Sequence, residues 1–183
     1  QAYLTKGITI GVMDARKKRP EADNAFPRLY RFSFEGGIGA YVSHLNEGTE
    51  RIGSVIAFEK DQPEGEVAIA IQYSQAFNEN VMSFANNIYT SEGGHHMTGF
   101  KAALTRTINA YAQSSGLSKQ LKEVSLSGDD VREGLTAVVS VRMPDPQFEG
   151  QTKAKLGNTF NAYYYTKDKK RKPVKSNPAG PSQ

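Results

Sequence analysis

Short apolar segments with strand-like spacing dominate the first half of the chain. Residues 4–13 are rich in Ile, Val and Thr, and residues 29–34 alternate apolar and polar side chains, which predicts a half-buried strand. Two further strands are predicted over residues 54–59 and 66–73, with a turn rich in Asp, Pro and Gly between them. A last strand in this half is predicted over residues 80–89.

Helical spacing appears in two other segments. Apolar side chains over residues 38–45 recur at helical spacing, and residues 46–48 are expected to end that helix. The longest helix is predicted over residues 97–114, with Gly116 just beyond its end. Its apolar positions recur every three or four residues, at Phe100, Leu104, Ile108 and Tyr111.

The segment after this helix predicts a short capped helix and a buried strand. Ser127 is a suitable N-cap, and Asp129 and Asp130 then lie in the first turn, where the helix dipole favours negative charge. Residues 135–142 form a nearly continuous apolar run, which predicts a strand buried on both faces. The whole pattern predicts an α+β fold of two layers, a mixed sheet with helices packed on one face.

The length of 183 residues suits one domain, or one domain followed by a tail. No apolar run approaches the roughly 18 to 20 residues that a membrane helix needs. The chain has no Cys, which excludes disulfides, thiolate zinc sites and cysteine nucleophiles. It begins at Gln1 rather than Met, and we expect it to be a fragment of a longer protein.

Positive charge is concentrated at the C-terminal end. Residues 162–183 carry six basic side chains and one acidic side chain, whereas residues 1–161 carry 17 basic and 18 acidic side chains. We therefore interpret residues 1–161 as the domain and residues 162–183 as a basic tail, which is disordered because it offers little apolar surface to bury. The tail could itself bind nucleic acid, and this is one alternative function of the chain.

A glycine-rich segment precedes the long helix and contains adjacent histidines. The favoured interpretation of residues 92–100 is a strand-to-helix turn whose glycines allow positive φ. An anion bound at the helix N-terminus is the alternative. A metal site is disfavoured, because His95 and His96 point apart as neighbours on one element and no third ligand is evident.

Two further segments contain residues suited to chemistry. Asp129, Asp130 and Glu133 could form an acidic Mg²⁺ site, but an N-terminal cap with helical ion pairing is the favoured interpretation. The segment 144–157 begins with a stiff Pro-Asp-Pro exit and carries Gln151, Lys153 and Lys155 at its end. It is either a solvated loop or a lysine presented to a phosphate beside an amide donor, and the residues alone leave both open.

Several long motifs, taken in order, resemble the second domain of the DNA gyrase B proteins. This domain is called the transducer and belongs to the bacterial type IIA DNA topoisomerases. The resemblance covers roughly residues 1–160. After Phe160 the family continues into a long helix, whereas this chain has Tyr163 to Tyr165 and a Lys/Arg cluster. We therefore expect a truncated or frame-shifted end rather than a native tail. The motifs are Glu92-Gly-Gly, Ala103-Leu-Thr-Arg106, Leu126-Ser-Gly-Asp-Asp-Val-Arg-Glu-Gly-Leu-Thr-Ala137 and Asp145-Pro-Gln-Phe-Glu-Gly-Gln-Thr-Lys153.

The resemblance implies a left-handed βαβ crossover and a role in coupling ATP hydrolysis to DNA strand passage. ATP with Mg²⁺ would be bound mainly by an upstream ATPase domain. Lys153 would contact the γ-phosphate and Gln151 would assist, so that the chain on its own is expected to hydrolyse no ATP. These residue types suit the role, since phosphoryl transfer is catalysed largely by positive charge and donors placed on phosphate oxygens.

The partners that the resemblance implies are double-stranded DNA, a gyrase A-like protein and a second copy in a dimer, in the cytoplasm at the nucleoid and away from membranes. The DNA-cleaving tyrosine would lie in the gyrase A-like partner. Arg106, Lys101 and Lys119, on or near the long helix, are candidates for DNA phosphate contacts. A third possibility is that the chain is an inert truncated fragment.

Overall fold

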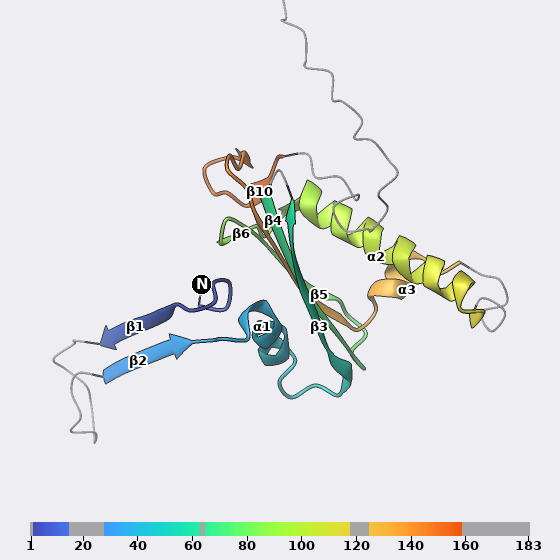
Figure 1. Ribbon diagram of the computed structural model, residues 1–183, viewed down its shortest axis with the longest axis horizontal. Coiled ribbons are helices and arrows are strands. Elements are labelled where there is room, and N and C mark those ends of the chain that lie inside the picture. The colour runs from blue at the N-terminus through green and yellow to red at the C-terminus, as the bar shows by residue number, and fades with distance from the viewer. Residues whose placement is uncertain (1, 15–27, 63–64, 118–124, 159–183) are drawn as a thin grey trace, which may run out of the picture.

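The computed structural model describes residues 2–14, 28–62, 65–117 and 125–158. It combines helices with strands in three separate sheets (Figure 1). The elements in chain order are β1 (Thr9–Asp14), β2 (Arg28–Ser33), α1 (Gly37–Leu45), β3 (Arg51–Gln62), β4 (Gly65–Ser74), β5 (Asn80–Ala85), β6 (Ile88–Tyr89), β7 (Gly93–Gly94), α2 (His95–Ser114), α3 (Gly128–Arg132), β8 (Leu135–Arg142), β9 (Phe148–Glu149) and β10 (Lys155–Leu156).

The central sheet has five strands in the order β3-β4-β8-β5-β6. Strand β8 lies between β4 and β5, antiparallel to the first and parallel to the second. All residues of β8 from Leu135 to Val141 are buried, which confirms the prediction of burial on both faces. Because β5 and β8 are adjacent and parallel, the chain from β5 through α2 to β8 forms a crossover, whose handedness stays a prediction.

Helices cover both faces of this sheet, so the prediction of two layers with helices on one face is wrong (Figure 1). Val67 and Ile69 of β4 share one hydrophobic cluster with Phe100 of α2. The next residue in β4, Ala68, shares a second cluster with Val42 of α1. The reason is that α1 and α2 each carry an apolar stripe, and the alternation of a buried strand offers each of them a separate face.

The N-terminal region differs from the predicted strand over residues 4–13 and the predicted half-buried strand over residues 29–34. The expected strand over residues 4–13 begins only at Thr9, and residues 2–7 form turns in which Ala2 and Leu4 are buried. Within the described part of the chain, strands β1 and β2 pair with each other alone, and they extend away from the body as a hairpin (Figure 1). Alternation predicted burial at residues 29–34, but none of the described layers covers the hairpin, so residues 29–33 are exposed.

The prediction of a single strand over residues 80–89 is also wrong. It is two strands, β5 and β6, joined by a tight turn at Asn86 and Asn87. Both turn residues have left-handed backbone angles, with φ of 47° and 65°, which Asn tolerates better than most residues. The predicted helices over residues 38–45 and 97–114 are confirmed, and the longer one begins two residues earlier, at His95.

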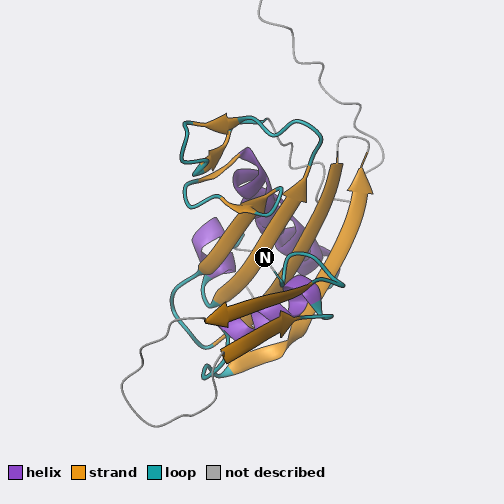
Figure 2. Ribbon diagram, turned by 90° about the vertical axis from the view of Figure 1, so that its left-hand side faces the viewer, coloured by secondary structure: helices purple, strands orange, loops and turns teal. Residues whose placement is uncertain are grey.

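A small third sheet, in the order β7-β10-β9, lies at one end of the central sheet (Figure 2). It contains the segment that the sequence singled out for phosphate binding. No helix in the described part of the chain is long and apolar enough to cross a membrane. The predictions for Lys119 and for the tail at residues 162–183 lie outside the described residues.

Candidate functional site

The candidate phosphate-contacting residues lie on a short hairpin. Strands β9 and β10 pair antiparallel, with Glu149 opposite Lys155 and Phe148 opposite Leu156. The intervening residues carry Gln151 and Lys153, and both side chains are exposed. The turn is closed by a hydrogen bond from the Lys153 N–H to the Gly150 carbonyl at 3.4 Å.

The backbone at the tip of this hairpin adopts an unusual conformation. Lys153 has a φ of 54°, which costs a non-glycine residue about 1 kcal/mol or more. Backbone strain of this kind occurs often at ligand-binding sites, where the surrounding structure holds it in place. Here the paired strands on both sides of the turn hold Lys153 in that conformation.

The two lysines of the hairpin are in different electrostatic environments. The Lys155 ammonium forms an ion pair with the Glu149 carboxylate at 3.0 Å. The Lys153 ammonium lies 5.8 Å from the ring centre of Phe148, within cation–π range, and makes no ion pair with the described residues. Among the described residues, the Lys153 charge therefore has no acidic partner, whereas the Lys155 charge has one.

The glycines before α2 place the hairpin against the body of the domain. Strand β7, which is Gly93–Gly94, pairs parallel with β10. A Cβ atom at Gly94 would collide with the backbone carbonyl oxygen of Leu156. The Glu92 N–H also donates to the Ala154 carbonyl at 2.9 Å. This docking role was not apparent from the sequence, because it depends on contact with a strand some 60 residues further along the chain.

The glycine turn has the conformation that the sequence predicted. Gly93 and Gly94 have φ values of 71° and 134°, a range in which L side chains are rare. His96, in the first turn of α2, is fully buried and its Nε2 lies 3.3 Å from the Thr90 hydroxyl. Burial lowers the pKa of His96 from 6.5 to about 4, so the ring is neutral near pH 7.

The Ser127 segment is a helix cap, as the favoured interpretation predicted. The Ser127 hydroxyl accepts from the Asp130 N–H, and the Asp130 carboxylate accepts from the Ser127 N–H at 2.8 Å, which completes a capping box. These hydrogen bonds lower the pKa of the Asp130 carboxyl. Asp129 forms an ion pair with Arg132 at 2.7 Å. Among the described residues, no group of three or more His, Asp or Glu side chains is placed to hold a metal ion.

The candidate DNA contacts on α2 are unequal. The Lys101 ammonium forms an ion pair with Glu79 at 2.6 Å, and the same carboxylate also binds the Arg132 guanidinium at 2.6 Å. Arg106 is exposed on the same helix. Among the candidates in the described part of α2, Arg106 therefore offers the less compensated charge, and both assignments remain predictions.

The fold is shared with solved structures of bacterial type IIA topoisomerase ATPase regions. The 43K ATPase domain of Thermus thermophilus gyrase B matches with a TM-score of 0.70 and 34% identity, covering 86% of this chain and 40% of that chain. The ATP-binding domain of Francisella tularensis topoisomerase IV matches with a TM-score of 0.63 and 25% identity, covering 86% and 39%.

The family model described as DNA gyrase B matches residues 37–169. The DNA gyrase B protein of Clostridium acetobutylicum is 49% identical over 164 residues, which is 86% of this chain and 24% of that protein. Its counterpart in Streptococcus pyogenes is 48% identical over 159 residues, or 86% and 23%. The chain therefore belongs to the DNA gyrase B family, and it spans about a quarter of the length of these relatives.

Proposed function

We propose that this chain is the transducer domain of an ATP-dependent type IIA DNA topoisomerase, comprising residues 1–161, and that it presents Lys153 to the γ-phosphate of ATP. The observation that carries the proposal is the contrast within one hairpin. Lys153 is exposed and has no ion pair with the described residues, whereas Lys155 forms an ion pair with Glu149 at 3.0 Å. The resemblance assigns the phosphate contact to that same residue, Lys153.

The chemistry of the hairpin fits a nucleotide bound mostly by another domain. ATP with Mg²⁺ supplies the transferable phosphoryl group, and most of its contacts belong to an upstream ATPase domain. In this proposal Lys153 places a positive charge on the γ-phosphate oxygens, and Gln151, on the same turn, adds a neutral donor. The turn fixes the backbone of Lys153 and the direction in which its side chain leaves the hairpin, so less of the residue remains to be ordered on contact.

The exposed apolar face of the β1–β2 hairpin favours the presence of a second domain that covers it. Direct cross-strand pairing places Val12 beside Tyr30 and Ile10 beside Phe32 on one face. Val12, Tyr30 and Phe32 are each more than 40% exposed. A two-stranded hairpin is marginally stable on its own, so an apolar face of this kind calls for a neighbouring domain. In the proposal, that neighbour is the upstream ATPase domain.

Through this domain, ATP hydrolysis would be relayed to the passage of one DNA duplex through another. The assembled protein would be a dimer with a gyrase A-like partner, acting at the nucleoid. Arg106 would contact the transported duplex. The alternative functions, nucleic-acid binding by the basic tail and an inert fragment, make no use of Lys153 and are separated from this proposal by the following experiment.

The test is steady-state ATP hydrolysis by this chain fused behind the ATPase domain of the Clostridium acetobutylicum relative. Lys153→Ala should lower kcat by on the order of 10² to 10³, by analogy with removal of one preorganised donor, with a smaller effect on ATP binding. Gln151→Ala should lower kcat more mildly. Lys155→Ala is the matched control, since its charge is already paired. Equal losses at Lys153 and Lys155, or no loss at Lys153, would contradict the proposal.

A further inference from the structure

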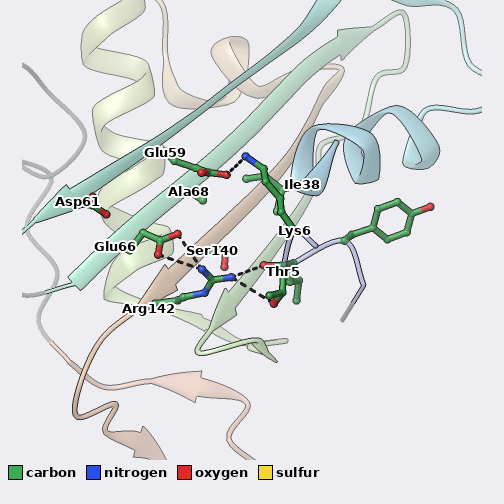
Figure 3. A pocket seen from close by; sticks show the side chains of 12 residues that line it. Thr5, Lys6, Ile38, Glu59, Asp61, Glu66, Ala68, Ser140 and Arg142 are labelled. Atoms are coloured by element: carbon green, nitrogen blue, oxygen red, sulfur yellow. Dashed lines mark hydrogen bonds and ion pairs between the residues drawn. The ribbon is translucent and has the colours of Figure 1, made fainter. Parts of the chain in front are cut away.

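The N-terminal segment of residues 2–7 lies beside the central sheet, and its residues 3–6 line one side of a pocket of about 380 Å³ (Figure 3). The walls come from this segment, from the start of α1, and from the adjoining ends of β3, β4 and β8. Arg142, the last residue of β8, points from the sheet toward the segment, and Lys6 points back toward β3. The pocket is thus crossed by side chains that tie the segment to three neighbouring strands.

Arg142 makes the most extensive of these contacts. Its Nη1 donates to both carboxylate oxygens of Glu66 on β4, at 3.1 and 3.2 Å. Its Nη2 donates to the backbone carbonyl of Leu4 at 2.6 Å and lies 3.5 Å from the Thr5 hydroxyl. One guanidinium therefore binds a neighbouring strand and the entering backbone at the same time, which the single ammonium of a lysine does not do with the same geometry.

The segment is also buried where Arg142 holds it. Leu4 packs into the cluster beneath α1 with Ile38 and Phe84. The Asn87 side chain donates to the Thr5 hydroxyl at 3.2 Å. By contrast, the ion pair between Lys6 and Glu59, at 2.7 Å, is about half exposed on both sides, and surface pairs of this type contribute little.

The residues that follow Arg142 in the chain lead to the Lys153 hairpin. Met143, the next residue, is bound through both of its backbone polar groups by the Asn86 side chain. Val141 and Met143 share a hydrophobic cluster with Leu156 of β10. Partly buried hydrogen bonds and buried apolar contacts therefore connect Leu4, through the end of β8, to the strand that supports Lys153.

We propose that Arg142 is a positioning residue, which locks the N-terminal segment to the end of β8 so that this segment and the Lys153 hairpin move as one rigid body. The inference rests on the proposed function, because the hairpin needs a fixed position only if it meets a nucleotide. Any movement between the upstream domain and this one is then transmitted to Lys153 without being absorbed at the junction. The role belongs to Arg142 because its guanidinium spans both partners.

The first test measures the clamp in this chain alone, by hydrogen exchange of the amides of residues 2–7. Arg142→Ala should speed their exchange, and Arg142→Lys should do so as well, because it keeps an ion pair with Glu66 but loses the fork to Leu4. Lys6→Ala is the matched control on the same segment and should have a much smaller effect. Unchanged exchange in both Arg142 variants would overturn the clamp.

The second test uses the fusion with the upstream ATPase domain. Arg142→Lys should lower kcat for ATP by on the order of tenfold to a hundredfold with little change in KM, since misplacement of a catalytic group acts on the chemical step. In a Lys153→Ala background the same substitution should cost nothing further. A full additional loss in that background would overturn the positioning role.

The two tests separate the inference from the function it rests on. If Lys153→Ala leaves kcat unchanged, the proposed function fails while the exchange data still report on the clamp. If Lys153→Ala lowers kcat but Arg142→Lys does not, the function stands and the positioning role is overturned. Melting temperatures of all variants show whether a loss of rate reflects unfolding, and the lysine variant is the one expected to stay folded.

Discussion

The Asn86 side chain binds the backbone of Met143 at both of its polar groups. Its Nδ2 donates to the Met143 carbonyl and its Oδ1 accepts from the Met143 N–H, each at 2.9 Å. Because Met143 directly follows β8, this pair sets the direction in which the chain leaves the sheet toward the Lys153 hairpin. A side chain in the β5–β6 turn thus makes the two backbone hydrogen bonds that a neighbouring strand would otherwise make with Met143.

Asn86→Ala is expected to lower the free energy of unfolding by about 2 to 4 kcal/mol. It removes two hydrogen bonds and leaves two partly buried backbone groups unsatisfied. Urea unfolding checks the value. Asn87→Ala is the matched control, because Asn87 has the same left-handed backbone but its side chain makes one hydrogen bond with the described residues, at 3.2 Å. Equal losses in the two variants would attribute the effect to backbone strain alone.

Gly94→Ala is expected to displace β10 from β7. The added Cβ would meet the Leu156 backbone, which cannot retreat as a flexible side chain would, and the φ of 134° adds strain. The loss in unfolding free energy should be about 1 to 3 kcal/mol, with faster hydrogen exchange over residues 148–156. At Gly116, with a φ of 76° and open space around it, Ala should cost only about 1 kcal/mol and leave that exchange unchanged.

His96 should make the stability of the chain depend on pH. Its pKa is about 4 in the folded chain against 6.5 ordinarily, so between these values the unfolded chain binds a proton that the folded chain does not. The free energy of unfolding should therefore fall as the pH drops from about 6.5 toward 4, by up to about 3 kcal/mol from this group.

Replacement of the buried ring tests this dependence. His96→Gln should flatten the slope of unfolding free energy against pH in this window, measured by urea unfolding at several pH values. His44→Gln, at a half-exposed position on α1, controls for loss of a histidine elsewhere. A slope that survives His96→Gln unchanged would show that other groups carry the dependence.

Arg106→Ala should weaken binding to double-stranded DNA and reduce the slope of log affinity against log salt by about one, the value for one phosphate contact. Fluorescence anisotropy at several salt concentrations measures both. Lys101→Ala should have a smaller effect, because Glu79 already neutralises that ammonium. If deletion of residues 162–183 abolishes binding while Arg106→Ala leaves it intact, the basic tail is the binding element.

The sequence predicted the elements whose pattern is local. The apolar stripe of α2, the Ser127 cap and the double burial of β8 follow from spacing within a few residues, and the structure confirms each. The sequence did not predict that helices pack on both faces of the central sheet. In β4, large side chains at Val67 and Ile69 alternate with small ones at Ala68 and Ala70, which suggests that only the face with the large side chains is packed. In the structure, α1 packs against the face with the small side chains.

In the candidate site too, the sequence identified residues within a local motif but not the contacts between distant segments. Lys153 and Gln151 stand out by their motif and lie together on an exposed turn, but their contact with a phosphate stays a prediction. The pairing of Lys155 with Glu149, the docking of β10 on Gly94 and the reach of Arg142 to Leu4 were not predictable from spacing. Each joins residues brought together only by the folded sheet.

The central position of β8 has a consequence for how the chain folds during synthesis. Strands β4 and β5 are not neighbours, and both find their partner in a strand that ends only at Arg142. Until that residue has left the ribosome, both helices face an incomplete sheet, and apolar surface on β4 and β5 stays open to water. Such long-range pairing slows folding and prolongs exposure to aggregation. A chain stopped before residue 135 is therefore expected to remain a client of chaperones rather than to fold.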